Sequence, residues 1–127
     1  MKYLFYLLLI PAAFSCHKKS QNEIFELSGN WELIQTERYL NDSLAGTALA
    51  EPGAVQYEFS NPDEFERGTL VIREEGYSDS TTYVLSNSQI DTDSGLHFEI
   101  LELKTNNLIL SNSWNYNQLI YSFNRSE

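Results

Sequence analysis

The stretch VQYEFS, residues 55–60, alternates apolar and polar side chains without a break. Successive side chains of a β-strand point to opposite faces, so Val55, Tyr57 and Phe59 are expected to share one face and their polar neighbours the other. NQLIYSFNR, residues 117–125, repeats the pattern. Both stretches therefore predict strands with one buried face.

Six further segments have strand composition, and short turn clusters such as Asn61-Pro62-Asp63 and Asp93-Ser94-Gly95 separate several of them. They are residues 31–40, 68–75, 81–86, 88–92, 96–103 and 107–113. Eight antiparallel strands with one apolar face each close most simply into an up-and-down β-barrel, so we expect an all-β domain over residues 27–127. A two-sheet sandwich stays open as the alternative, because alternation does not distinguish curvature from stacking.

One predicted connection is long. Residues 41–54, NDSLAGTALAEPGA, join the first two strands and are rich in leucine and alanine. A connection of this length is usually functional or disordered. We expect a helical turn from Ser43 to Ala50, stopped by Pro52-Gly53, with Leu44 and Leu49 forming a lid over an open barrel end.

The N-terminal region has the layout of a secretory signal peptide: a short basic start, an apolar core over residues 4–10, and small residues before Cys16, the one cysteine of the chain. Ala13-Phe14-Ser15-Cys16 resembles the lipobox of bacterial lipoproteins. The resemblance implies that residues 1–15 are removed and that Cys16 is acylated. The alternative is an ordinary cleaved signal with an incidental cysteine.

Residues 16–26 are then expected to be a lipidated tether that holds the domain close to a membrane. Position 17 is histidine, whereas aspartate there resembles the inner-membrane retention signal of enteric lipoproteins. We therefore expect the outer membrane of a Gram-negative bacterium, on either face.

The chain is acidic, with 18 Asp and Glu against 8 Lys and Arg. Such a surface repels phosphate backbones, so nucleic-acid binding is not expected. It also disfavours electrostatic attachment to anionic lipids, which leaves the acyl chains as the membrane contact.

Gly29-Asn30-Trp31 matches the G-x-W signature at the first strand of lipocalins, and Arg125 matches their basic residue in the last strand. The chain therefore resembles a small bacterial lipocalin-like lipoprotein. The resemblance implies that Gly29, Trp31 and Arg125 close the barrel, with the guanidinium across the indole. The chain lacks a middle T-D-Y-like motif and a C-terminal helix segment, which raises the question of a filled interior.

Catalytic and metal-binding patterns are sparse. His97 and Glu99 share a predicted strand face, but a metal site needs three or four ligands. The sequence DTDSG, residues 91–95, resembles the start of a calcium loop without its closing acids, so a hairpin turn is the better interpretation. The sequence contains no G-x-S-x-G motif, and neither histidine is placed to form a catalytic triad with an activated serine. We expect no enzyme, no metal and no cofactor.

Two functions follow from a lipid-anchored barrel. In the first, the barrel binds a small apolar or amphipathic ligand, or a peptide segment. The residues expected to line its interior are Trp31, Leu33, Tyr57, Phe59, Leu70, Ile72, Tyr83 and Leu85. In the second, the barrel is filled and serves as a protein-interaction module, either an envelope-assembly accessory or an inhibitor of a basic secreted hydrolase such as lysozyme. An apolar cavity of about 300 Å³ or more would favour the first function.

Overall fold

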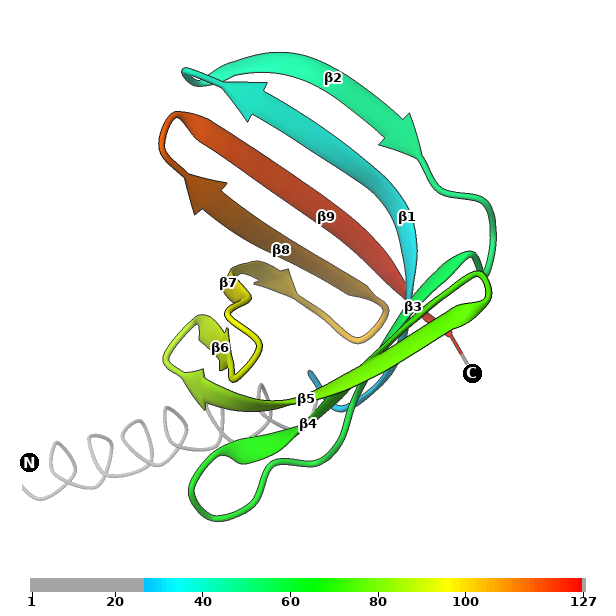
Figure 1. The fold of residues 1–127 in the computed structure, drawn as a ribbon, viewed down its shortest axis with the longest axis vertical. Helices are drawn as coiled ribbons and strands as arrows, with labels where there is room; N and C mark the ends of the chain where they lie inside the picture. Colours follow the sequence, from blue (N-terminus) through cyan, green and yellow to red (C-terminus); the bar gives the residue numbers. More distant parts are fainter. Residues whose placement is uncertain (1–26, 127) are drawn as a thin grey trace, which may run out of the picture.

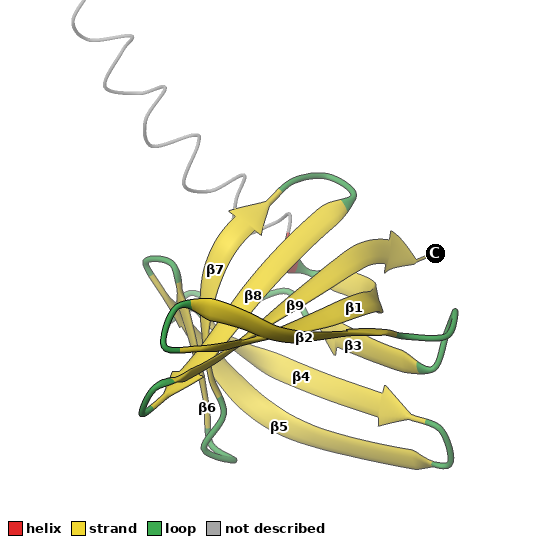
Figure 2. Ribbon diagram, turned by 90° about the horizontal axis from the view of Figure 1, so that it is seen from above, coloured by secondary structure: helices red, strands yellow, loops and turns green. Residues whose placement is uncertain are grey.

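The computed structural model describes residues 27–126, which form nine β-strands and almost no helix (Figures 1 and 2). The strands are β1 (Gly29–Leu40), β2 (Ser43–Leu49), β3 (Val55–Phe59), β4 (Arg67–Glu74), β5 (Tyr77–Ser86), β6 (Gln89–Thr92), β7 (His97–Leu103), β8 (Asn107–Trp114) and β9 (Asn117–Ser126). The predicted signal peptide and the whole of the predicted tether, including Cys16, lie outside the described residues. Within residues 27–126, no helix has the length and apolar character needed to cross a membrane.

Eight of these strands close into an antiparallel barrel. Neighbours pair in the order β1-β3-β4-β5-β6-β7-β8-β9, and β9 pairs again with β1. The predicted all-β, eight-stranded barrel is therefore confirmed, and the sandwich alternative is not adopted. The ninth strand, β2, lies beside β1 outside this ring.

Strand β1 has two partners along one edge. Residues 29–32 pair with β3, whereas residues 35–40 pair with β2. Strand β9 pairs along the opposite edge over residues 30–40 of β1. The chain between β2 and β3 is fastened to β1, because the amide of Ala50 donates to the carbonyl of Ile34 at 2.9 Å. Strands β2 and β3 thus act as one interrupted partner of β1.

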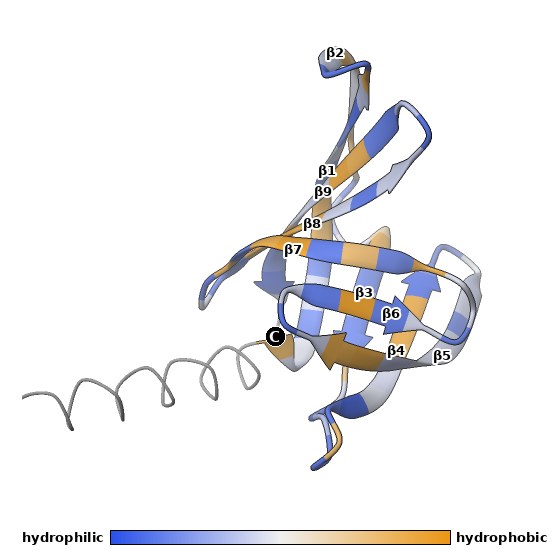
Figure 3. Ribbon diagram, turned by 90° about the vertical axis from the view of Figure 1, so that its left-hand side faces the viewer, coloured by the Kyte–Doolittle hydropathy of each residue, from blue (hydrophilic) through white to orange (hydrophobic). Residues whose placement is uncertain are grey.

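The register between β1 and β9 shifts between Leu33 and Gln35, which leaves Ile34 as an extra residue. Such a bulge increases the local twist and changes which residues face inward. Beyond it, the far parts of β1, β9 and β8, together with β2, extend past the rest of the barrel (Figure 3). We call this extension the wing, residues 35–49 and 111–120.

The barrel interior holds the hydrophobic core. Its largest fully buried side chains are Trp31, Tyr83, Phe59, Phe123, Leu27, Leu70, Ile90, Leu108 and Leu110. Eight of these side chains come from seven of the eight ring strands, and Leu27 lies two residues before β1. The remaining strand, β7, contributes the buried side chain of Phe98. Burial of this apolar surface is the main favourable contribution to folding.

The junction of β1 and β9 is fastened by Arg125. Its guanidinium lies over the indole of Trp31, 4.1 Å from the ring centroid, and Nη1 donates to the carbonyl of Ser28 at 2.8 Å. The indole nitrogen of Trp31 donates to the carbonyl of Leu27 at 2.8 Å. Gly29 has a φ of 119°, and a Cβ there would lie 2.7 Å from Nη1 of Arg125. Glycine is therefore required beneath the guanidinium.

We predict a measurable coupling between Trp31 and Arg125. Trp31→Ala should lower the free energy of unfolding by about 3–5 kcal/mol, because it removes a large buried aromatic side chain. Arg125→Met should lower it by less, and the double variant should lose about 0.5–2 kcal/mol less than the two single losses added together. Urea unfolding of the four proteins measures this cycle.

The other hydrogen bonds of Arg125 are lost in both arms of the cycle and cancel, so the coupling reports the ring contact. If Trp31→Ala does not fold, Trp31→Leu provides a milder version of the same cycle. Additive losses would show that the stacked pair contributes nothing to closure.

Candidate functional site

The eight residues predicted to line a ligand pocket all belong to the core. Seven of them are buried, and Ile72 is partly buried and packs against the rest. The structure therefore brings these residues together, as the strand alternation indicated. Whether they surround a hollow depends on the contacts between opposite walls.

Aromatic rings meet across the barrel. Strands β3 and β7 lie on opposite walls, four positions apart in either direction around the ring of eight. The rings of Tyr57 on β3 and Phe98 on β7 nevertheless lie 6.2 Å apart, and Tyr57 lies 4.8 Å from Phe123 on β9. Aromatic pairs in contact have centroids 4.5–7 Å apart. At this level, side chains fill the full width of the interior.

The part of the interior around Phe59 and Tyr83 is also densely packed. The rings of Phe59 and Tyr83 meet edge to face with centroids 5.4 Å apart, and the hydroxyl of Tyr83 donates to the carbonyl of Ser60 at 2.7 Å. A Cβ placed on Gly68 would lie 2.6 Å from Cε1 of Tyr83. Strand β4 therefore needs glycine at this position so that the tyrosine ring can lie against its backbone.

Burial changes the acidity of the interior phenols. Burial raises the pKa of Tyr57 well above its ordinary value of 10.0, and the Tyr121 phenol and Glu74 carboxylate raise it further. Burial also raises the pKa of Tyr83 to about 12 and raises that of Tyr121. A low-dielectric environment disfavours the phenolate, which agrees with a packed interior.

The predicted helical turn over residues 43–50 is wrong, because this segment is strand β2. Asn41 and Asp42 have φ values of 50° and 65°, which suit a two-residue hairpin turn and direct the chain back along β1. Backbone pairing with β1 then overrides the helical preference of alanine and leucine. Leu44 and Leu49 are 55% and 79% exposed, so the predicted lid over the barrel end is not formed.

All seven residues of β2 are exposed. Its free edge has no strand partner among residues 27–126, since β2 ends the hydrogen-bonded order. The sequence SLAGTAL contains no charged residue and no proline, which are the usual means of protecting an edge strand. The backbone of β2 can therefore accept a further strand.

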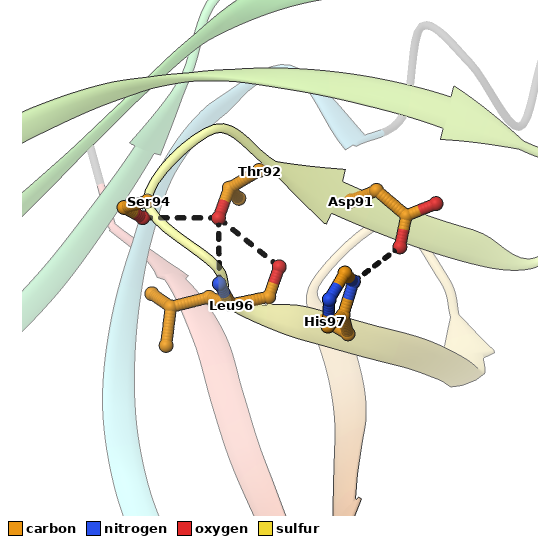
Figure 4. Close-up of polar contacts among 5 residues, drawn as sticks. All are labelled: Asp91, Thr92, Ser94, Leu96 and His97. Carbon is orange, nitrogen blue, oxygen red and sulfur yellow. Dashed lines mark hydrogen bonds and ion pairs between the residues drawn. The ribbon is translucent and has the colours of Figure 1, made fainter.

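The weaker metal candidates occupy the β6–β7 hairpin. His97 Nδ1 lies 2.6 Å from Asp91 Oδ1 across the two strands, and both side chains are about half exposed or more. Thr92 Oγ1 bonds to both backbone groups of Leu96, which makes DTDSG a hairpin turn (Figure 4). Among the described residues, no three His, Cys, Asp or Glu side chains gather in a metal-binding group.

Two of the hollows on the described surface are polar, and none of the eight predicted lining residues borders either of them. One, of about 380 Å³, lies where β3 and β4 meet the chain before β3. The other, of about 350 Å³, lies at the end of the wing, and we call it the tip hollow. It is lined by Tyr39, Asn41, Asp42, Ser113, Asn115, Tyr116, Asn117 and Gln118. The clustering of Tyr and Asn in residues 114–118 is the sequence signal that could have indicated it.

Comparison with known proteins adds no assignment, since no family model and no curated protein matches the chain. The lipocalin resemblance therefore rests on three residues, Gly29, Trp31 and Arg125, and on the closed barrel that they join.

We predict that the protein loses stability at alkaline pH through its interior phenols. Above pH 10.0 the unfolded chain releases protons that the folded chain retains at Tyr57, Tyr83 and Tyr121. Ionisation therefore stabilises the unfolded state relative to the folded state. The free energy of unfolding should fall as pH rises from about 10 to about 12. Tyr57→Phe should reduce this slope, as measured by urea unfolding at each pH.

Tyr116→Phe is the matched control, because that side chain is 77% exposed and should leave the slope unchanged. Difference absorbance of the folded protein follows phenolate formation directly. An interior open to water would let Tyr57 ionise near its ordinary pKa of 10.0, and this result would contradict a packed barrel.

Proposed function

We propose that this chain is an outer-membrane lipoprotein whose filled, lipocalin-like barrel serves as a rigid platform for binding a protein. Cys16 carries the lipid, residues 17–26 form the tether, and the free edge of β2 is the binding surface. The partner contributes an extended segment that adds a strand to β2.

The contact between Tyr57 and Phe98 carries the choice between the two functions considered for the barrel. Rings from opposite walls with centroids 6.2 Å apart leave no room for a ligand between them. Binding of a small apolar ligand inside the barrel stays a prediction, and the packed interior favours the interaction module. A filled barrel places the functional groups on the outside.

The edge of β2 has the properties of a strand-addition site. It is exposed along all seven residues, and it carries no charge or proline that would repel an incoming strand. Main-chain hydrogen bonds supply affinity in such complexes. Leu44 and Leu49, both exposed, offer apolar contacts beside them.

The charge of the chain selects the partner. A formal net charge of −10 attracts basic proteins and raises their rate of association. Two copies of this chain repel each other for the same reason, which disfavours pairing of one β2 with another. A basic secreted hydrolase, or a basic segment of an envelope-assembly factor, has the required chemistry.

We predict site-specific cross-linking at β2. A photoreactive residue in place of Thr47 should capture a basic protein in intact cells, because a partner strand would lie against the free edge of β2. The same residue in place of Thr69 should capture none, since this exposed threonine belongs to β4, which pairs on both sides. Adding Ala45→Lys should reduce the Thr47 adduct by introducing a charge into the edge.

Mass spectrometry identifies the captured chain. Equal capture at both threonines, or no capture at either, would exclude β2 as the binding surface. An adduct between two copies of this chain would replace the heterologous partner with self-association.

We predict that Cys16→Ser abolishes membrane attachment. The acyl chains on Cys16 supply the anchor in this proposal, and each buried CH₂ contributes about 0.8 kcal/mol. The variant should remain unprocessed or appear in the soluble fraction, whereas Ser15→Ala keeps the small residue before the cysteine and should remain anchored. Retention of Cys16→Ser in membranes after a carbonate wash would contradict lipid anchoring.

A further inference from the structure

The tip hollow joins two hairpin turns that are far apart in the sequence. Asn41 belongs to the β1–β2 turn and Tyr116 to the β8–β9 turn, and the amide of Asn41 donates to the carbonyl of Tyr116 at 3.0 Å. Asn41, Asp42 and Asn115 all have positive φ values, as tight turns require. The two turns that border the hollow are therefore held together by a backbone hydrogen bond and by the conformation of the turns themselves.

The lining is chemically uniform. Its eight residues comprise two phenols, four amides, one hydroxyl and one carboxylate, with no lysine, arginine or histidine. Amides and hydroxyls present both donors and acceptors, and an ionised carboxylate accepts only. A saccharide has a matching surface, because its hydroxyl groups donate and accept while its C–H faces pack against aromatic rings.

Neighbouring residues leave suitable groups available. Arg38 donates to Oδ1 of Asn117 at 3.4 Å, so the amide nitrogen of Asn117 remains a donor. Gln118 donates through Nε2 to Ser111 at 2.9 Å, so its Oε1 remains an acceptor. Within residues 27–126, no side-chain hydrogen bond engages Asp42, Asn115 or Tyr116.

Tyr116 supplies the apolar contact. Its side chain is 77% exposed at the rim, so one face of the ring can cover a ligand that sits in the hollow. Tyr39 is half-buried and lines the same space from β1. An aromatic ring with a polar end suits a ligand that is itself amphipathic.

We propose that the tip hollow binds a neutral saccharide. The carboxylate of Asp42 and the absence of a cation in the lining disfavour an acidic sugar. The polar lining disfavours the apolar ligand considered for the barrel interior. This proposal goes beyond the protein-binding function and does not depend on it, because a sugar at the tip leaves the free edge of β2 uncovered.

The test uses full-length protein in a detergent without a sugar head group. Chitotriose represents the β-linked N-acetylglucosamine of a cell-wall glycan, maltotriose represents an external neutral glucan, and trigalacturonic acid is the acidic comparison. Titration is followed by intrinsic fluorescence, because Trp114 pairs in register with Asn117, which lines the hollow, and is 44% exposed. We expect saturable binding of at least one neutral trisaccharide and none of the acidic one.

Tyr116→Ala should weaken that binding by at least ~10-fold, because it removes the stacking surface. Asp42→Asn should also weaken it while retaining a residue that tolerates positive φ. Tyr77→Ala is the matched control, since this tyrosine is 59% exposed on β5 and does not line the hollow. All three should retain the thermal unfolding midpoint of the parent.

Preference for chitotriose or for maltotriose decides between a cell-wall and an external source. Absence of saturable binding of both neutral sugars would overturn the proposal. So would tighter binding of the acidic sugar, or equal affinity in Tyr116→Ala and the parent. None of these results bears on cross-linking at β2.

Discussion

The pairing of β1 with β9, fastened by Arg125 over Trp31, is the constraint on which the rest of the structure depends. Closure pairs both edges of the barrel strands and turns their alternate side chains toward a common core. It requires glycine at position 29, where any Cβ would meet the guanidinium. A small domain without a disulfide thus obtains its cooperativity from one seam that joins the two ends of the chain.

Closure also explains why an exposed edge remains. Strand β3 covers only residues 29–32 of β1, whereas β9 extends along the strand to Leu40. The rest of β1 needs a partner for its backbone groups, since unpaired backbone groups are costly. Strand β2 provides it, and thereby moves the unpaired edge outward from β1 to itself. The free edge is a geometric consequence of a first strand longer than its barrel.

Alternation in residues 55–60 and 117–125, together with the strand composition of six further segments, was sufficient to predict the eight barrel strands and most of the core. It failed for β2, which is exposed on both faces and so has no alternation to detect. Asn41 and Asp42 are residue types that tolerate positive φ, and they indicate a two-residue turn. The composition of residues 41–54 as a whole nevertheless favours one long connection. The filled interior was not predictable from strand pattern, since it depends on how far Tyr57 and Phe98 reach across the ring. The tip hollow depends on two turns brought together by tertiary structure.

The density of the interior determines where function can reside. Tyr83 lies so close to Gly68 that even one added carbon would displace it, and such a core has little freedom to accept a ligand. The wing has that freedom, because all of β2 is exposed and the side chains of Trp114 and Tyr116 at its end are 44% and 77% exposed. Tyr39 links the two proposed surfaces, since it lines the tip hollow and pairs in register with Leu44 of β2. Both surfaces therefore depend on the same two-residue turn, Asn41-Asp42, which holds β2 against β1 and borders the hollow.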